Sequence, residues 1–377
     1  MFKLIRIISL FALLSAWICS AQAPLAEERI LLTFVPNVQF APFYVGIEKG
    51  FFAKAGFDVR LEHLQEPEVL DLVAVRQADF GVVSGEQVIL ARSRGRDVVY
   101  IFEWFQQYPV ALVHSDALKL TDLEQLRGLK VGIPGRFGAN YSGLTTLLSS
   151  AGLSESDIEV NEIGFNAAEV VCLGAVDAAM VYANNEPLQI RDRAAAGDCG
   201  DITDVEVITV ASQVDLVSNG LIVSRSLLEA APDSATAMAL ALKEALQFSI
   251  NNPAAAYLAS LRHVDTLPGD ESLIAELEAV AERQAQFLAA KPDRAGVAES
   301  RAELLRQLAE QFDASVLTQF QVLLNTIELW DADQLGVSAL ASWEAMRDTL
   351  ALMGFLGGEL GDLSDAFSNE YVLGGSE

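Results

Sequence analysis

The sequence predicts an α/β protein made of two similar lobes with a C-terminal helical extension. Short apolar runs rich in Val and Ile alternate with helical stretches from Ile30 to Val223, a pattern typical of parallel sheets covered by helices on both faces. A strand-like motif occurs twice, at Gln77–Ser84 and at Ala175–Tyr182, separated by about the length of one lobe. After Ser224, the high content of Ala, Leu, Glu and Arg favours helix.

The alternating region contains ten candidate strands, which together predict one sheet in each lobe. In chain order they are Ile30–Val35, Asp58–His63, Phe80–Val83, Val98–Phe102, Val110–His114, Lys130–Ile133, Glu159–Ile163, Ala178–Val181, Val205–Thr209 and Gly220–Val223. The helical extension contains five candidate helices, at Asp233–Asn251, Pro253–Arg262, Ser272–Leu288, Ala298–Gln311 and Leu317–Leu329. We expect these helices to cover lobe one and to carry no chemistry of their own.

The order of these elements predicts that the chain leaves lobe one, forms lobe two and returns. Lobe one is expected at residues 27–114 and 215–350, lobe two at residues 115–214, and a tail at residues 351–377. The two crossings between lobes are expected at Trp104–Leu112 and Thr209–Asn219. Two lobes with facing loops form a cleft, so we expect a ligand between them.

Composition and charge narrow the class of partner. The chain has 377 residues, is 51% hydrophobic with a mean hydropathy of +0.30, and has a formal net charge of −27. This composition is typical of a folded protein with sizeable cores. A surface this acidic repels phosphate backbones, so we expect no nucleic-acid partner, and we expect a monomer.

The N-terminal residues 1–23 have the features of a secretory signal peptide. Lys3 and Arg6 precede the mainly apolar run Ile7–Ile18, and small residues follow, which predicts export to the periplasm or an equivalent extracytoplasmic space. Lipid anchoring at Cys19 is an alternative, although the preceding residues fit a lipobox poorly.

Two cysteines remain after such a signal peptide is removed. Cys172 and Cys199 fall in the same predicted lobe, so an exported protein could pair them. We expect two buried free thiols instead, with the disulfide as the alternative.

Candidate ligand-binding residues occur in the loops that follow the predicted strands. They combine aromatic rings with amides and hydroxyls, which suits a flat heterocycle whose faces stack and whose edges form hydrogen bonds. They are Asn37, Phe40 and Tyr44 after the first strand; Ser84, Glu86 and Gln87 after the first motif copy; Trp104 and Tyr108 at a crossing; Arg136, Phe137, Asn140 and Tyr141 in a glycine-containing loop; and Tyr182, Asn184 and Glu186 after the second motif copy. Catalytic and metal-binding motifs are not recognisable, and we expect no cofactor.

Several segments resemble one family of transport proteins. The run Phe34–Phe52, the strand Ala78–Val82, the entry to lobe two at Leu123–Gly132 and the closing stretch Ala366–Tyr371 are together similar to the thiamine-pyrimidine-synthase-like solute-binding proteins of ABC importers. This resemblance implies a type II periplasmic-binding-protein fold, in which two lobes close on a ligand and the closed form docks on an ABC permease. It implies no enzymatic activity.

A second set of segments resembles one branch of that family. Gly135–Ala139, Ile163–Asn166 and Val181–Pro187 look most like the RibY-type riboflavin-binding branch, so the resemblance implies riboflavin as ligand. Related proteins bind an aminopyrimidine precursor of thiamine, which is the second candidate. The chain departs from the yeast-type pyrimidine synthases, because it lacks their Cys-rich motif and histidine, and an exported α/β enzyme is the remaining alternative.

Overall fold

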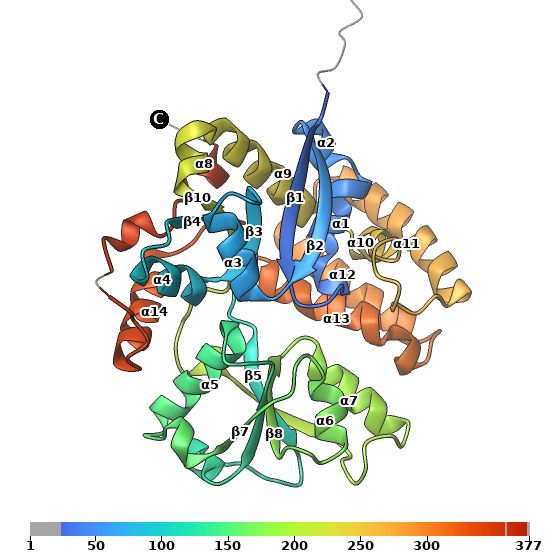
Figure 1. Ribbon diagram of the computed structural model, residues 1–377. Helices are drawn as coiled ribbons and strands as arrows, with labels where there is room; N and C mark the ends of the chain where they lie inside the picture. The colour runs from blue at the N-terminus through green and yellow to red at the C-terminus, as the bar shows by residue number, and fades with distance from the viewer. Residues whose placement is uncertain (1–23, 359, 375–377) are drawn as a thin grey trace, which may run out of the picture.

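The computed structural model describes residues 24–358 and 360–374, and these residues form two α/β lobes that each contain a five-stranded sheet (Figure 1). This confirms the predicted fold class. The signal peptide and the lipobox cysteine expected within residues 1–23 lie outside the described residues.

The two sheets have the same topology. In lobe one the strand order is β2 (Phe57–Leu64), β1 (Ala26–Thr33), β3 (Phe80–Ser84), β10 (Asn219–Ser224) and β4 (Val98–Glu103). In lobe two it is β7 (Glu159–Glu162), β6 (Lys130–Ile133), β8 (Ala178–Tyr182), β5 (Val110–Ser115) and β9 (Val205–Thr209). The two copies of the sequence motif become β3 and β8, which occupy the same middle position, so the repeat seen in the sequence reflects a real structural correspondence.

Both sheets are mixed, and the expectation of parallel sheets was wrong in this respect. β10 runs antiparallel to β3 and β4, and β5 runs antiparallel to β8 and β9. Each of these two strands enters its sheet directly from the other lobe. Because no helical crossover within its own lobe precedes it, such a strand is free to run against its neighbours.

The chain passes between the lobes twice, at residues 104–109 and 210–218. The boundary expected at residue 114 is therefore too late, because β5 pairs with β8 and β9 and belongs to the sheet of lobe two. Because β4 and β5 on either side of the crossing are both apolar, the sequence pattern did not indicate at which residue the chain changes lobe.

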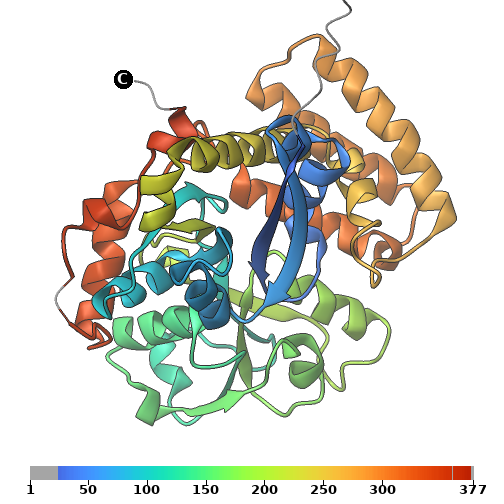
Figure 2. The same cartoon turned by 45° about the horizontal axis from the view of Figure 1, so that its top comes forward.

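Helices cover both faces of lobe one and extend it. They are α1 (Ala41–Glu48), α2 (Phe51–Lys54), α3 (Glu66–Ala74), α4 (Gly85–Ser93), α8 (Arg225–Ala230), α9 (Pro232–Asn251), α10 (Pro253–Ser260), α11 (Glu271–Ala289), α12 (Arg294–Ala309), α13 (Ala314–Trp330), α14 (Leu340–Leu352) and α15 (Glu370–Leu373). The five helices predicted after Ser224 are confirmed as α9 to α13. Asp270 and Asp293 begin α11 and α12 by accepting hydrogen bonds from backbone N–H groups. These two helices extend outward from the body (Figure 2).

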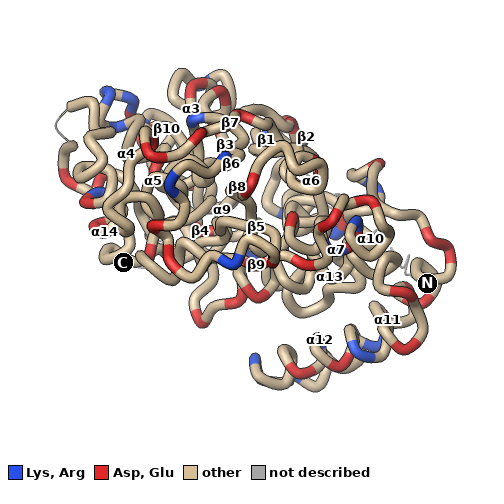
Figure 3. Tube along the Cα trace, turned by 90° about the horizontal axis from the view of Figure 1, so that it is seen from below, with Lys and Arg blue, Asp and Glu red and all other residues tan. Residues whose placement is uncertain are grey.

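Lobe two is smaller and is covered by α5 (Gly138–Ser150), α6 (Ala167–Cys172) and α7 (Glu186–Ala195). The C-terminal stretch expected as a tail belongs to lobe one instead. Phe367 pairs with Tyr100 beside β4, and its ring stacks on Trp343 at 5.1 Å between centroids. Asp and Glu residues lie on both lobes and on the projecting helices (Figure 3). Among the described residues, no helix is long and apolar enough to cross a membrane.

Cys172 and Cys199 form a disulfide, so the expectation of two free thiols was wrong. Cys172 ends α6 and Cys199 follows α7, and both side chains are buried in the core of lobe two with their Cα atoms 4.1 Å apart. The spacing of 27 residues in the sequence did not reveal this proximity, because it depends on how α6 packs against α7.

We predict that this disulfide stabilises lobe two by restricting the unfolded chain. For a loop closed over a separation of 27 residues, the Cys172→Ser/Cys199→Ser variant should lower the free energy of unfolding by about 3.5 kcal/mol. Denaturant titration with and without reductant measures the effect in protein lacking residues 1–23. Reductant should destabilise only the unsubstituted protein. Thiol labelling of that protein under denaturing, non-reducing conditions would contradict the disulfide.

Candidate functional site

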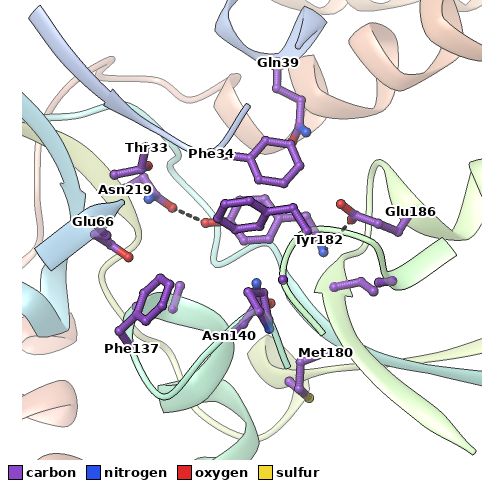
Figure 4. Close-up of a pocket in the computed structure, with 17 residues that line it drawn as sticks. Thr33, Phe34, Gln39, Glu66, Phe137, Asn140, Met180, Tyr182, Glu186 and Asn219 are labelled. Atoms are coloured by element: carbon purple, nitrogen blue, oxygen red, sulfur yellow. Dashed lines mark hydrogen bonds between the residues drawn. The ribbon is translucent and has the colours of Figure 1, made fainter. Parts of the chain in front are cut away.

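A cavity lies between the two lobes, at the carboxyl ends of β1, β6 and β8 (Figure 4). This is the place where α/β sheets present loop residues to ligands. Its lining residues are Thr33, Phe34, Gln39, Glu66, Pro134, Phe137, Gly138, Ala139, Asn140, Gly164, Phe165, Ala167, Met180, Val181, Tyr182, Glu186 and Asn219. Four of the sequence-predicted residues, Phe137, Asn140, Tyr182 and Glu186, are among them.

Phe34 and Phe165 join the lobes at one side of the cavity. Their rings meet edge to face with centroids 4.8 Å apart, Phe34 from lobe one and Phe165 from lobe two. Phe34 has a positive φ of 67°, which is unusual for an aromatic residue and turns the chain sharply after β1. Phe34 was not predicted as a lining residue, because the apolar run Ile30–Val35 indicates that it belongs to the buried strand.

Tyr182 lies in the middle of the cavity wall and connects the lobes by a hydrogen bond. Its hydroxyl donates to Asn219 Oδ1 at 2.6 Å, from the end of β8 to the start of β10 (Figure 4). Glu186 begins α7, and its Oε2 accepts the Tyr182 backbone N–H at 3.0 Å. Burial raises the pKa of Glu186 to about 7; in its protonated form this carboxyl can donate as well as accept a hydrogen bond.

Asn184 holds the lobes together and does not line the cavity. Its Nδ2 donates to Gln39 Oε1 at 2.9 Å and to Thr326 Oγ1 at 2.7 Å, and the side chain is buried. Thr326 lies on α13, so a helix expected to carry no chemistry contributes to the contact between lobes. Residues 184 and 326 are far apart in the sequence, and no local pattern reveals their contact.

Two buried carboxyls meet at Ser84, and one of them, that of Glu66, lines the cavity. The Ser84 hydroxyl is within hydrogen-bonding distance of both Glu66 Oε1 and Glu86 Oε1, and the Ser84 backbone N–H donates to Glu66. One hydroxyl proton cannot serve two carboxylates, so a carboxyl proton must complete the second hydrogen bond. Burial raises the pKa of both acids, and the neighbouring Glu66 charge helps to raise that of Glu86 to about 8.

The cavity combines aromatic surface with few charges. Among the described residues, its charged lining side chains are Glu66 and Glu186, and both are acids with raised pKa values. Arginine, lysine and histidine are not among the lining residues. No group of three or more His, Cys, Asp or Glu side chains in residues 24–358 and 360–374 could hold a metal ion. The arrangement therefore suits a neutral or cationic ring and disfavours an anion.

Four other predicted residues, Phe40, Tyr44, Trp104 and Tyr108, are buried in hydrophobic cores. Trp104 packs against Phe40, Phe43, Phe105 and Trp330, and only 2% of its surface is exposed. Tyr44 stacks on His263 at 4.9 Å. Tyr108 donates its hydroxyl to the Ala139 carbonyl at 3.0 Å. Trp104 was expected to face a ligand from the crossing, but α13 places Trp330 against it and closes the core there.

The remaining predicted residues lie outside the cavity. Arg136 forms ion pairs with Glu155 and Glu162 on the surface of lobe two. Tyr141 stacks on Phe355 at 5.8 Å, next to Gln87, in a separate depression between α4, α5 and the C-terminal segment. Asn37 begins the short 3-10 helix η1 (Val38–Phe40) by accepting the Gln39 N–H, and it lines an outer groove described below.

The two lobes lie close together in this structure. The cavity has a volume of about 70 Å³, whereas a cavity of roughly 150 Å³ is known to hold benzene. At Gly138, with φ of 68°, the backbone of lobe two approaches lobe one so closely that an added Cβ would lie 2.1 Å from Glu66 Oε2. A ring can therefore enter only when the lobes or the lining side chains move apart.

Comparison with known families identifies this architecture. Residues 37–256 match the family described as "NMT1/THI5 like". The chain belongs to this family. The two-lobe fold is shared with solved structures, among them a Staphylococcus aureus protein described as the ligand-binding component of an ABC-type import system. That structure is 11% identical, with a TM-score of 0.59, over 93% of this chain and 99% of its own.

Curated relatives in this NMT1/THI5-like family differ in their described ligands and roles. A riboflavin-binding protein RibY from Chloroflexus aurantiacus is 29% identical over 95% of this chain and 89% of its own length. A formylaminopyrimidine-binding protein from Halalkalibacterium halodurans is 29% identical over 49% of this chain and 58% of its own. A pyrimidine phosphate synthase from Legionella pneumophila is 22% identical over 44% of this chain and 52% of its own.

Gly138→Ala should hold the lobes apart in the ligand-free protein. The new methyl group would collide with Glu66, whose carboxyl is fixed by Ser84 and cannot swing away cheaply. Gly128→Ala is the matched control, because Gly128 also has a positive φ, of 81°, but nothing lies near its Cβ position. Small-angle X-ray scattering should give a larger radius of gyration for Gly138→Ala only. Identical scattering from the two variants would contradict the close contact.

The buried carboxyl at Glu86 should make the fold less stable as the pH rises. The folded state keeps the proton up to a pKa of about 8, whereas the unfolded chain releases it near 4.5, so the stabilisation present below 4.5 is lost as the pH rises to 8. Relative to the unsubstituted protein, Glu86→Gln should therefore melt higher at pH 9 than at pH 5. Exposed Glu229→Gln is the control and should show no such change. A pH-independent difference for Glu86→Gln would contradict the raised pKa.

Proposed function

We propose that this protein is the extracytoplasmic substrate-binding component of an ABC importer and that it captures riboflavin between its two lobes. The observation that carries the proposal is the interlobe cavity, which combines aromatic rings with amide and carboxyl groups and carries no basic side chain among its described lining residues. The lobes would close on the vitamin, and the closed form would dock on the permease.

The side chains that line the cavity suit a ligand that is a flat, uncharged heterocycle. Phe137 and Tyr182 offer ring faces, while Asn140 and Asn219 offer both donors and acceptors to ring edges. Protonated Glu66 or Glu186 could donate to a ring carbonyl, and the ionised forms could accept from a ring N–H. An isoalloxazine ring presents both kinds of group along one edge.

The riboflavin assignment takes precedence over the aminopyrimidine for one reason. The likeness to the riboflavin-binding relative extends along 95% of this chain, whereas the likeness to the formylaminopyrimidine-binding relative extends along 49%. An aminopyrimidine would also suit acidic acceptors, so it stays as the second candidate and as an arm of the test.

A binding role also fits the positions of the nucleophilic and basic side chains better than a synthase role does. The two cysteines described are joined in a disulfide, and the three histidines lie outside the cavity. Ser84 is buried between two acids, without a basic partner to activate its hydroxyl. We infer that the protein releases its ligand unchanged.

Purified protein lacking residues 1–23 should quench riboflavin fluorescence saturably, with a Kd in the micromolar range or below, equivalent to about 8 kcal/mol. Tyr182→Ala should weaken binding by about 1–3 kcal/mol because it removes a ring face and a hydrogen bond between the lobes. Tyr182→Phe should recover part of this loss, because it restores the ring alone.

Tyr141→Ala is the matched control for this titration. Tyr141 is a tyrosine of the same lobe that lies outside the cavity, so its removal should leave the riboflavin affinity unchanged. Saturable binding of an aminopyrimidine but not of riboflavin would transfer the assignment to the thiamine branch. Binding of neither compound would reject the proposed function.

A further inference from the structure

The cavity described above is the inner of two adjoining spaces. A wider groove, which we call the outer chamber, has a volume of about 460 Å³. Lobe one contributes the loop after β1, the segment between α10 and α11, and the first turns of α13. Lobe two contributes α6 and α7. α7 lies beside α13 (Figure 3), and residues of both helices line the outer chamber, so this chamber lies where the two lobes meet.

Three residues line both chambers and mark where they meet. Phe34, Phe165 and Glu186 belong to the walls of the inner cavity and of the outer chamber alike. The edge-to-face contact between the two phenylalanine rings separates the spaces in this arrangement. Since one ring comes from each lobe, movement of the lobes would open the passage between chambers.

The two chambers differ in chemistry. The inner one is smaller and its lining includes the rings of Phe34, Phe137, Phe165 and Tyr182, whereas the wider outer one has seven amide or hydroxyl side chains in its lining, together with apolar and charged ones. The amides and hydroxyls include Asn37, Asn166, Gln189, Thr318 and Gln319. Such groups can each donate and accept, which matches the hydroxyls of a flexible chain better than the edge of a ring.

We propose that the ligand spans both chambers, with its flat ring in the inner one and a neutral, hydroxylated chain in the outer one. This inference rests on the proposed function and specifies which flavin the site accepts. Riboflavin has this form, because its ribityl chain extends from one side of the ring. The passage at Phe34 and Phe165 then surrounds the junction between ring and chain.

The charges of the outer chamber select against a phosphorylated chain. Its acids are Glu169, Glu186 and Asp192, and its one cation among the described lining residues is Arg193. Even when Glu186 is neutral, two carboxylates face one guanidinium. A phosphate at the end of the chain adds about −1.5 to −2 charges at neutral pH, so it would meet net repulsion. The site should therefore accept riboflavin and disfavour its 5′-phosphate, FMN.

Three flavins with the same ring system test the inference. Lumiflavin carries a methyl group in place of the ribityl chain, riboflavin carries the full chain, and FMN adds the phosphate. Riboflavin should bind at least about tenfold more tightly than lumiflavin, equivalent to one or two hydrogen bonds to the chain. It should also bind at least about tenfold more tightly than FMN, and added salt should reduce this second difference.

Reversing the charge of two acids in the outer chamber provides a second test, which compares the Kd values of FMN and riboflavin. Glu169→Lys/Asp192→Lys should lower the ratio of the FMN Kd to the riboflavin Kd by about tenfold at low salt. Glu229→Lys/Glu299→Lys is the matched control, because it changes the net charge equally at exposed sites outside both chambers. The control should leave the ratio unchanged.

The outcomes separate this inference from the proposed function. Equal affinities for riboflavin, lumiflavin and FMN would overturn the two-chamber site while leaving riboflavin binding intact. The same ratio change in the charge-reversal variant and its control would overturn the role of the outer chamber acids. Failure of all three flavins to bind would instead overturn the proposed function.

Discussion

The close approach of two lobes across a buried acidic site is the constraint on which the rest of this structure depends. Glu66 is fixed by Ser84 and faces the Gly138 backbone of the other lobe, where a side chain would not fit. Asn184 adds buried hydrogen bonds to Gln39 and Thr326. These few contacts bring the loops of two separate sheets into one cavity, and within residues 24–358 and 360–374 only two crossings of the chain connect those sheets.

Burying the carboxyls of Glu66 and Glu86 changes the charge of the site. Among the described residues, the hydrogen-bond partner shared by buried Glu66 and Glu86 is Ser84 and not a basic side chain, and burial raises the pKa values of both acids. The cavity can therefore be nearly neutral although the formal charge of the whole chain is −27. A neutral aromatic ligand can enter such a cavity without the desolvation cost that an unpaired charge would impose.

Much of the fold could be predicted from the sequence, because it follows from local patterns. Alternating apolar runs marked the strands, and the repeated motif marked β3 and β8 as equivalent. The site was predictable where residues follow these strands directly, as at Phe137, Asn140, Tyr182 and Glu186. It was not predictable where the role depends on a distant partner. Trp104 is buried by Trp330, Asn184 is held by Thr326, and Cys172 meets Cys199 through helix packing.

A crystal structure of the riboflavin-loaded protein would show whether the ligand lies between the lobes. We expect electron density for the ring between Phe137 and Tyr182, in contact with both lobes, with the ribityl chain directed past Phe34 and Phe165. The lobes should be farther apart at Gly138 and Glu66 than they are here, since the present cavity of about 70 Å³ is too small for the ring. Ring density elsewhere, or in contact with one lobe only, would show that the cavity between the lobes is not the binding site.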